Sequence, residues 1–526
     1  MTEPAAPIAK LSHRQILVVF AGLMTGMLLA ALDQTVVATA LPTIVGELGG
    51  LEHLSWVVTA YLLTSTASSP LYGKVSDLYG RRRVFQFAIV VFLIGSALAG
   101  LSRNMGQLIA FRAVQGLGAG GLFVMALTII GDILSPRERG RYQGYMGSVF
   151  AFSSVAGPLL GGLFVDHLTW RWIFYINLPL GAVALVVTSF ALNLPFVRRP
   201  HRIDYEGAAL LIAGVSCLLL VTVWGGTEYP WGSPLIVGLG AAGALLTVLF
   251  VLREHYAAEP ILPLRLFRNR VFTLTGGAGF ILGLCMLGGA IFLPLFLQVA
   301  TGASATNSGL LILPLTAGVV TMSITTGRLI TRTGRYKFWP VVGSVFMTGG
   351  LFLLSRMEVS TSRLESSLYM LVLGLGLGMV MQVLIIALQN AVEHRDLGIA
   401  TSTNTFFRSL GGAFGAALFG AILSGRLAYH LPRLLPPDAG PIDPALITGS
   451  PAMIRALPPA VQTAVAEAFA RSIVSVFRWA IPFAAVSLIL ALAIPEHPLR
   501  DPAHIGAPGP AHREPPETPA AAAGRD

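Results

Sequence analysis

The sequence has few charged residues. Asp, Glu, Lys and Arg make up only 11% of its 526 residues, against about 25% in an ordinary soluble domain. Hydrophobic residues account for 54% of the chain, and the mean hydropathy is +0.73. A chain so poor in charge cannot expose most of its surface to water, so the composition excludes an ordinary soluble protein and indicates an integral membrane protein.

Cysteines and catalytic groupings are also scarce. The two cysteines, Cys217 and Cys285, both fall inside apolar runs, where packing explains them better than a disulfide or a metal pair, and neither is assigned a role. The histidines lack metal-ligand spacing, and no Gly-Lys-Ser/Thr sequence of an ATP-binding loop is present. We therefore expect no enzyme activity, no metal site, no cofactor and no direct coupling to ATP.

The formal net charge of +10 would suggest a nucleic-acid partner for a soluble protein. Here the cations lie in short loops between apolar runs, for example at 74–83, 137–141 and 328–337, and the alternate loops carry few. This bias is typical of membrane topology, so we expect no nucleic acid as a partner. It predicts a multi-pass cell-membrane protein with both termini in the cytoplasm.

Apolar runs of about twenty residues, the length at which a helix crosses a bilayer, recur about fourteen times. They predict an all-α polytopic membrane protein. The runs begin near Ile16, Leu54, Val84, Met105, Tyr142, Ile173, Gly207, Ser233, Val271, Ala305, Phe338, Ser367, Leu397 and Ile473.

Two loops with equal glycine spacing indicate an internal duplication. The segment Gly73–Arg83 reads GKVSDLYGRRR, and Gly327–Lys337 reads GRLITRTGRYK. Both carry basic residues after the second glycine, whereas Thr331 replaces Asp77. Either the second copy is a relic or the acid is needed in one half only. Duplicated helical halves are a common plan of transporters.

The offset between the two loops defines the expected domains. Two pseudo-symmetric six-helix bundles flank an inserted two-helix hairpin. The expected segments are a cytoplasmic tail at 1–13, the first bundle at 14–195, the hairpin with its flanking cytoplasmic segments at 196–270, the second bundle at 271–495 and a disordered cytoplasmic tail at 496–526. A long outside loop is expected at 425–471, in which 458–469 suits a short amphipathic surface helix.

Three charged residues lie within predicted spans, where each costs at least a few kcal/mol and is a functional candidate. Asp33 and Arg112 fall at similar depths in the first and fourth spans, and Arg408 falls near the middle of the thirteenth. If their helices are neighbours, Asp33 and Arg112 can pair or compete for a proton. The alternatives are a water-facing carboxylate and a purely structural ion pair. Arg408 suits either an anionic group or backbone carbonyl oxygens.

Glycines and loop charges mark two further features. A Gly-Pro-Leu-Leu-Gly-Gly string in the fifth span predicts a bend and a tightly packed seam, as a packing kink or as a seal between moving halves. Its residues are Gly157, Pro158, Gly161 and Gly162. Charges at two inside loops predict a latch, against the alternative of solvated charges worth about 0–1 kcal/mol a pair. The candidate latch residues are Gly73, Asp77, Gly80, Arg81, Asp132 and Arg139.

Together these motifs resemble those of the major facilitator superfamily, and within it the fourteen-span drug:proton antiporters of the multidrug-resistance type. The loop Gly73–Arg83 is similar to the superfamily's inside-loop signature, and Leu32–Pro42 to the first-span signature of that branch. The string Arg112–Gly121 resembles the fourth-span signature assigned to proton coupling. Gly157–Gly162 resembles the antiporter signature of the fifth span, and Trp170–Pro179 is also similar to that branch.

The resemblance implies two bundles that alternate access to a central cavity, lined mainly by the first, fourth, ninth and twelfth spans. By analogy Asp33 is the proton-responsive carboxylate and Arg112 its coupling partner. The implied cavity residues are Asp33, Gln34, Arg112, Gln115, Gln382, Gln389 and Arg408.

The leading hypothesis is a secondary transporter, driven by the proton gradient, that exports hydrophobic and preferentially cationic drugs or toxic compounds. Asp33 suits cations, whereas Arg112 and Arg408 suit anions, and the sequence leaves this choice open. The alternatives are export of an endogenous siderophore, antibiotic or lipid, and a non-transporting membrane sensor or binding protein. The expected partners are small-molecule substrates, protons and the lipid bilayer. We expect a monomer, with accessory export proteins as an alternative.

Overall fold

The computed structural model of the chain describes residues 13–48, 54–192, 204–226, 228–257, 259–300, 311–436 and 458–499. The elements in these ranges are helices, apart from one isolated bridge between Gly225 and Tyr229. Eleven of the described helices are long and apolar enough to cross a membrane, so the predicted all-α membrane fold is confirmed. The count of fourteen spans stays a prediction. Most of both expected tails, at 1–12 and 500–526, lies outside the described residues.

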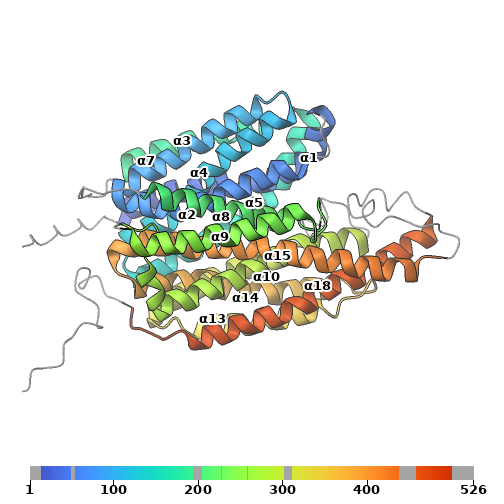
Figure 1. Ribbon diagram of the computed structural model, residues 1–526. Coiled ribbons are helices and arrows are strands. Elements are labelled where there is room, and N and C mark those ends of the chain that lie inside the picture. Colours follow the sequence, from blue (N-terminus) through green and yellow to red (C-terminus); the bar gives the residue numbers. More distant parts are fainter. Residues whose placement is uncertain are drawn as a thin grey trace, which may run out of the picture.

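The first bundle groups the helices from the N-terminal part of the chain (Figure 1). The Asn104 side chain caps α4, and Ser135 forms a capping box with Glu138 at the start of α5. Phe85 and Phe92 are fully buried in its apolar core. Its helices are α1 (His13–Leu48), α2 (Leu54–Tyr79), α3 (Arg81–Gly100), α4 (Met105–Ile133), α5 (Pro136–His167), α6 (Trp172–Tyr175) and α7 (Asn177–Ala191).

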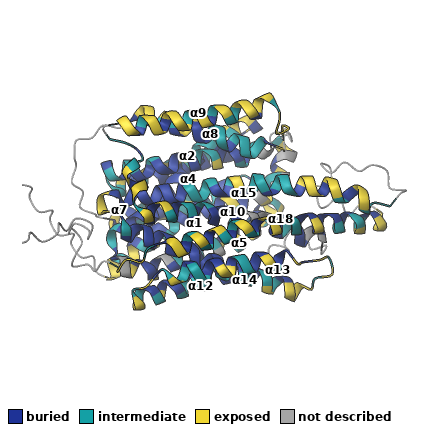
Figure 2. Cartoon of the chain, turned by 60° about the horizontal axis from the view of Figure 1, so that its bottom comes forward, coloured by how far each residue is buried: buried dark blue, intermediate teal, exposed yellow. Residues whose placement is uncertain are grey.

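A helix hairpin follows, formed by α8 (Tyr205–Trp224) and α9 (Pro234–Tyr256). The side chains of Asp204 and Ser233 cap these helices by accepting hydrogen bonds from backbone N–H groups. α8 packs against α2 and α15 through a buried cluster that includes Leu219. α9 lies outside α8 and exposes much of its surface, as expected of an apolar helix that faces lipid (Figure 2).

The second bundle contains the largest buried apolar cluster, which runs through α10, α13, α14, α15 and α18. Short 3-10 turns precede α10 and α15. The elements are η2 (Leu264–Arg268), α10 (Arg270–Ala300), α12 (Leu313–Thr333), α13 (Phe338–Leu354), α14 (Arg363–Ala391), η3 (His394–Asp396), α15 (Leu397–Leu434) and α18 (Pro459–Ala493).

The structure differs from the long outside loop expected at 425–471. α15 continues to Leu434, and α18 begins at Pro459, so both flanks of that segment are helical. The residues expected to form a separate surface helix, 458–469, are instead the start of α18. The two helices extend side by side beyond the rest of the molecule (Figure 1). They stay together there through buried Leu427 and Leu431 of α15 and Val465 of α18, which belong to one apolar cluster. Residues 437–457 lie outside the described residues.

The two bundles touch closely at the ends that carry the glycine loops. Gly140 of α5 faces Gly327 of α12, and a Cβ on either would collide with the backbone carbonyl of the other. Likewise, a Cβ on Gly73 of α2 would collide with the side chain of Ser402 of α15. The second glycines of the two loops, Gly80 and Gly334, both have a positive φ, of 93° and 70°, a conformation that favours glycine. The duplicated loops therefore share a positive φ at the second glycine, although ψ differs, at 140° for Gly80 and 2° for Gly334.

Candidate functional site

Asp33 of α1 and Arg112 of α4 form an ion pair inside the first bundle. Arg112 Nη1 donates to Asp33 Oδ2 at 2.5 Å, and the side chains are 2% and 0% exposed, respectively. Both helices are apolar around these positions, so each charge would be costly without the other. The neighbouring helices that the pairing hypothesis required are present.

The remaining oxygen of Asp33 is also occupied. Asp33 Oδ1 accepts hydrogen bonds from Gln115 Nε2 at 2.8 Å and from Asn177 Nδ2 at 3.3 Å. Ser96 joins the same network, because it accepts from Asn177 Nδ2 at 3.0 Å and from Gln115 Nε2 at 3.1 Å. These four side chains are all buried. The carboxylate is thus held by donors from α4 and α7, with Ser96 of α3 behind them.

Arg112 has further contacts beyond Asp33. Its Nη1 donates to Gln115 Oε1 at 2.7 Å, and its Nε donates to the Val57 carbonyl at 3.3 Å. The guanidinium carbon lies 4.2 Å from the ring centroid of Tyr61 and 5.8 Å from that of Phe174, distances that allow cation–π attraction. Arg112 is therefore fixed by several helices rather than by one carboxylate.

Sequence reasoning missed Ser96, Asn177 and Tyr61 as members of this network. Asn177 lies in the string Trp170–Pro179, which pointed to the family and not to a role. Ser96 and Tyr61 are an ordinary serine and tyrosine within apolar runs. Their positions opposite Asp33 depend on helix packing, and no local signal distinguishes them.

A cavity of about 840 Å³ lies between the bundles. The expected spans contribute, through α1, α4, α10 and α14, but α2, α5, α8 and α15 line it as well. α8 takes part because the hairpin packs across α2 and α15. The hairpin therefore forms part of the cavity wall, a role that the sequence did not predict.

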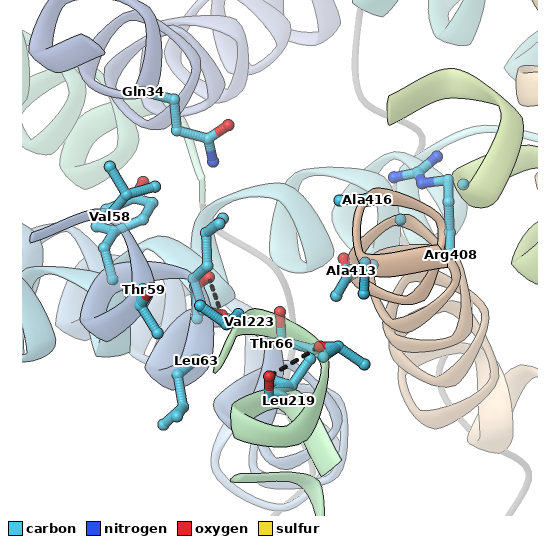
Figure 3. Close-up of a pocket in the computed structure, with 18 of the residues that line it drawn as sticks. Gln34, Val58, Thr59, Leu63, Thr66, Leu219, Val223, Arg408, Ala413 and Ala416 are labelled. Carbon is cyan, nitrogen blue, oxygen red and sulfur yellow. Dashed lines mark hydrogen bonds between the residues drawn. The ribbon is translucent and has the colours of Figure 1, made fainter. Parts of the chain in front are cut away.

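Of the expected cavity residues, only Gln34, Arg112 and Arg408 line this cavity. Figure 3 shows Gln34 and Arg408 on helices at opposite sides of the view. Asp33 and Gln115 lie behind the cavity wall, in the network described above. The expectation that these two face the cavity is therefore corrected for the conformation described here.

Gln382 and Gln389 of α14 also do not line the cavity, although both are buried. Gln389 Nε2 donates to the Leu127 carbonyl of α4 at 3.2 Å and to Thr401 Oγ1 at 3.1 Å. Gln389 therefore ties the two bundles together at their contact rather than facing a substrate.

The charged latch residues come together at the loop end of α2. Arg81 pairs with Asp77 at 2.5 Å and with Asp132 at 2.6 Å, so one cation joins two acids. Burial raises the pKa of the Asp77 carboxyl to about 6, with Arg81 opposing the shift. Arg139 donates to the backbone carbonyls of Gly131 and Leu134.

The latch lies against the second bundle. A Cβ on Gly398 of α15 would collide with the side chains of Asp77 and Arg81, and one on Gly73 would collide with Ser402. Gly80 supplies the break between α2 and α3 that places Arg81 beside Asp77. The charge cluster therefore sits at the contact between the bundles.

The glycines of the expected kink pack α5 against α1. Gly157 leaves room for Thr35 and Gly161 leaves room for Thr39, since a Cβ on either would collide with a threonine hydroxyl. Thr35 Oγ1 also donates to the Ser153 carbonyl at 2.9 Å. Gly162 faces open space. Pro158 lies within α5, and its side chain is outside the described residues.

Comparisons with known proteins fit this architecture. A family model described as Major Facilitator Superfamily matches residues 23–416. The chain is 44% identical, over 92% of its length and 70% of the relative, to the uncharacterized MFS-type transporter Rv1877 of Mycobacterium tuberculosis. It is 39% identical, over 81% of this chain and 79% of the relative, to the multidrug transporter protein MdtP of Bacillus subtilis.

Solved structures show the same fold. The proton:xylose symporter XylE matches with a TM-score of 0.59 at 14% identity, over 94% of this chain and 99% of that chain. At this identity the match shows the fold alone. With the family model and the relatives, it leads to one conclusion: the chain belongs to the Major Facilitator Superfamily and is a multi-pass membrane transporter rather than an enzyme.

Proposed function

We propose that the protein is a proton-coupled efflux antiporter that exports hydrophobic small molecules by alternating access. One observation carries the proposal: Arg112 belongs both to the cavity wall and to the buried ion pair with Asp33. A molecule in the cavity therefore meets a guanidinium whose counterion is the buried Asp33 carboxylate. Substrate and proton can then act on the same group from opposite sides.

The coupling follows from the charges. While Asp33 is ionised, its charge holds Arg112 in the network. Protonation of Asp33 removes that charge and weakens the hold on the guanidinium, which then leans more on Gln115, Val57 and the cavity, and deprotonation restores the ion pair. The pair thus has two states that differ in charge and in what the cavity wall presents. A ligand that prefers one state shifts the equilibrium between them.

Alternating access requires the contact between the bundles to open. In the conformation described here, the close approaches of Gly140 to Gly327 and of Gly73 to Ser402 seal the end with the glycine loops. The positive-inside bias assigns this end to the cytoplasm, with both termini there and the protein in the cell membrane. Rocking of the bundles would separate these contacts and expose the cavity to the cytoplasm. The direction of export is supported by a relative in Gibberella fujikuroi, FUS6, which is named an efflux pump and is 33% identical over 79% of this chain.

Proton flux in vesicles tests the proposal. Purified protein is reconstituted with an imposed pH gradient, and hydrophobic dyes of either charge, rhodamine 123 and fluorescein, are added in separate runs. We expect at least one dye to dissipate the gradient with the wild type and neither to do so with Asp33→Asn. Glu47→Gln is the matched control, because it removes a carboxylate from the same helix at an exposed position. If no member of a broad set of dyes and drugs moves protons through the wild type, the proposal is refuted, and export of an endogenous metabolite or a non-transport role takes its place.

A further inference from the structure

We propose that the cavity takes amphipathic organic anions, and that Arg408 binds their anionic group. The proposal rests on the export function proposed above and names its substrate class. It departs from the preference for cations that Asp33 suggested in the sequence.

The charge of the cavity wall has one sign. Among the described residues that line the cavity, the charged ones are Arg112 and Arg408, and no Asp or Glu is present. The charge of Arg112 is compensated by Asp33. The Arg408 side chain makes no hydrogen bond or ion pair with any described residue. The wall therefore carries one uncompensated cation on an otherwise largely apolar surface.

Helix packing brings the backbone of α10 directly against α15 beside Arg408. A Cβ on Gly283 of α10 would collide with the Arg408 carbonyl, and one on Gly411 of α15 would collide with the Phe280 carbonyl. The two backbones are thus in contact along this stretch. Thr405, one turn earlier on α15, also lines the cavity, but its hydroxyl donates to the Thr401 carbonyl. The Arg408 guanidinium is left at the cavity wall (Figure 3).

An uncompensated charge inside a membrane protein is costly, and such residues are generally retained for function. The planar fork of arginine fits a carboxylate, a sulfonate or a phosphate ester through two parallel hydrogen bonds. The same cavity is lined by apolar side chains, among them Ala413 of α15 and, across from Arg408, Leu219 and Val223 of α8. A ligand with one anionic group and an apolar body would satisfy both parts of the wall.

A cationic ligand would be less well accommodated. It would be repelled by Arg408 and would not reach Asp33, both of whose carboxylate oxygens already accept hydrogen bonds. The volume of about 840 Å³ is within the roughly 300–1,000 Å³ typical of sites for drug-sized molecules. The cavity therefore suits an anion with a multi-ring apolar body.

A pair of dyes with the same ring system and opposite charge tests the assignment. Fluorescein is an anionic xanthene dye and rhodamine 123 a cationic one. Their binding to the purified full-length protein in detergent is measured by fluorescence polarisation. We expect the wild type to bind fluorescein more tightly, and Arg408→Gln to weaken fluorescein binding about tenfold to a hundredfold while strengthening rhodamine 123 binding. Arg408→Lys should retain part of the affinity. Arg433→Gln, an exposed arginine change on the same helix, is the control.

The outcomes separate this assignment from the export function. If the wild type binds fluorescein no more tightly than rhodamine 123, or if Arg408→Gln leaves the ratio unchanged, the assignment is wrong. The same samples are assayed for dye-driven proton flux. Fluorescein binding through Arg408 without any proton flux would support the assignment and refute proton coupling. Proton flux with rhodamine 123, together with equal binding in Arg408→Gln, would support export and overturn the assignment.

Discussion

The buried ion pair makes a strong prediction about stability. Asp33→Asn changes one side-chain atom, but it leaves the Arg112 guanidinium, which is 2% exposed, without its counterion at 2.5 Å. Removing one partner of a buried pair costs about 3–5 kcal/mol, because the remaining charge is uncompensated. We expect a loss of this size for Asp33→Asn, and a similar one for Arg112→Gln.

The double variant Asp33→Asn/Arg112→Gln is expected to be less damaging than either single change. It removes both charges, and the remaining loss comes from hydrogen bonds, at about 1–3 kcal/mol for the network. The double-mutant cycle should therefore be non-additive by more than about 3 kcal/mol. The exposed pair of Glu47 and Arg171 has the same separation of 2.5 Å, with side chains 49% and 28% exposed, and is the matched control. Its cycle is expected to give about 0–1 kcal/mol.

The measurement is reversible unfolding in mixed micelles with increasing dodecyl sulfate, followed by circular dichroism at pH 7.5. The free energy of unfolding is compared for the wild type, the single variants and the double variant of each pair. Additivity of the Asp33 and Arg112 changes within about 0.5 kcal/mol would refute the reasoning, because it would mean that neither charge depends on the other.

Three further predictions concern the glycines and the latch. Gly161→Ala should lower the free energy of unfolding by about 1–3 kcal/mol, whereas Gly162→Ala, which faces open space, should raise it by up to about 1 kcal/mol; the same titration compares them. Gly327→Val should abolish dye transport by holding the bundles apart, and spin labels across the contact should report a longer distance. Burial raises the pKa of Asp77 to about 6 when the contact between the bundles is closed. Protonated Asp77 therefore stabilises the closed contact at low pH, and this stabilisation is lost as the pH rises through about 6. Spin-label distances across the contact should lengthen between pH 5 and 7.5 in the wild type and stay constant in Asp77→Asn. Arg81, Asp132 and Lys74 also act on the carboxyl. The same lengthening in the variant would assign the pH dependence to another group.

Features that depend on local chemistry could be read from the sequence alone. Long apolar runs indicate membrane-spanning helices whatever their partners, because a backbone in lipid must form its hydrogen bonds within the helix. Asp33, Arg112 and Arg408 stood out because a charge in such a run is costly wherever it points. The paired glycine loops were visible as a repeat, and the structure adds that both second glycines have a positive φ.

Which polar groups meet depends on how the helices pack, and the sequence does not show this. A buried helix in a membrane protein is apolar all round, so its hydropathy does not reveal which face turns to the cavity and which to a neighbouring helix. For that reason Gln389, expected in the cavity, bonds to α4 across the bundle contact, and Asn177 lies beside Asp33 without any sequence signal. The same holds for Arg408, whose depth is readable from the sequence but whose place on the cavity wall depends on how the helices pack.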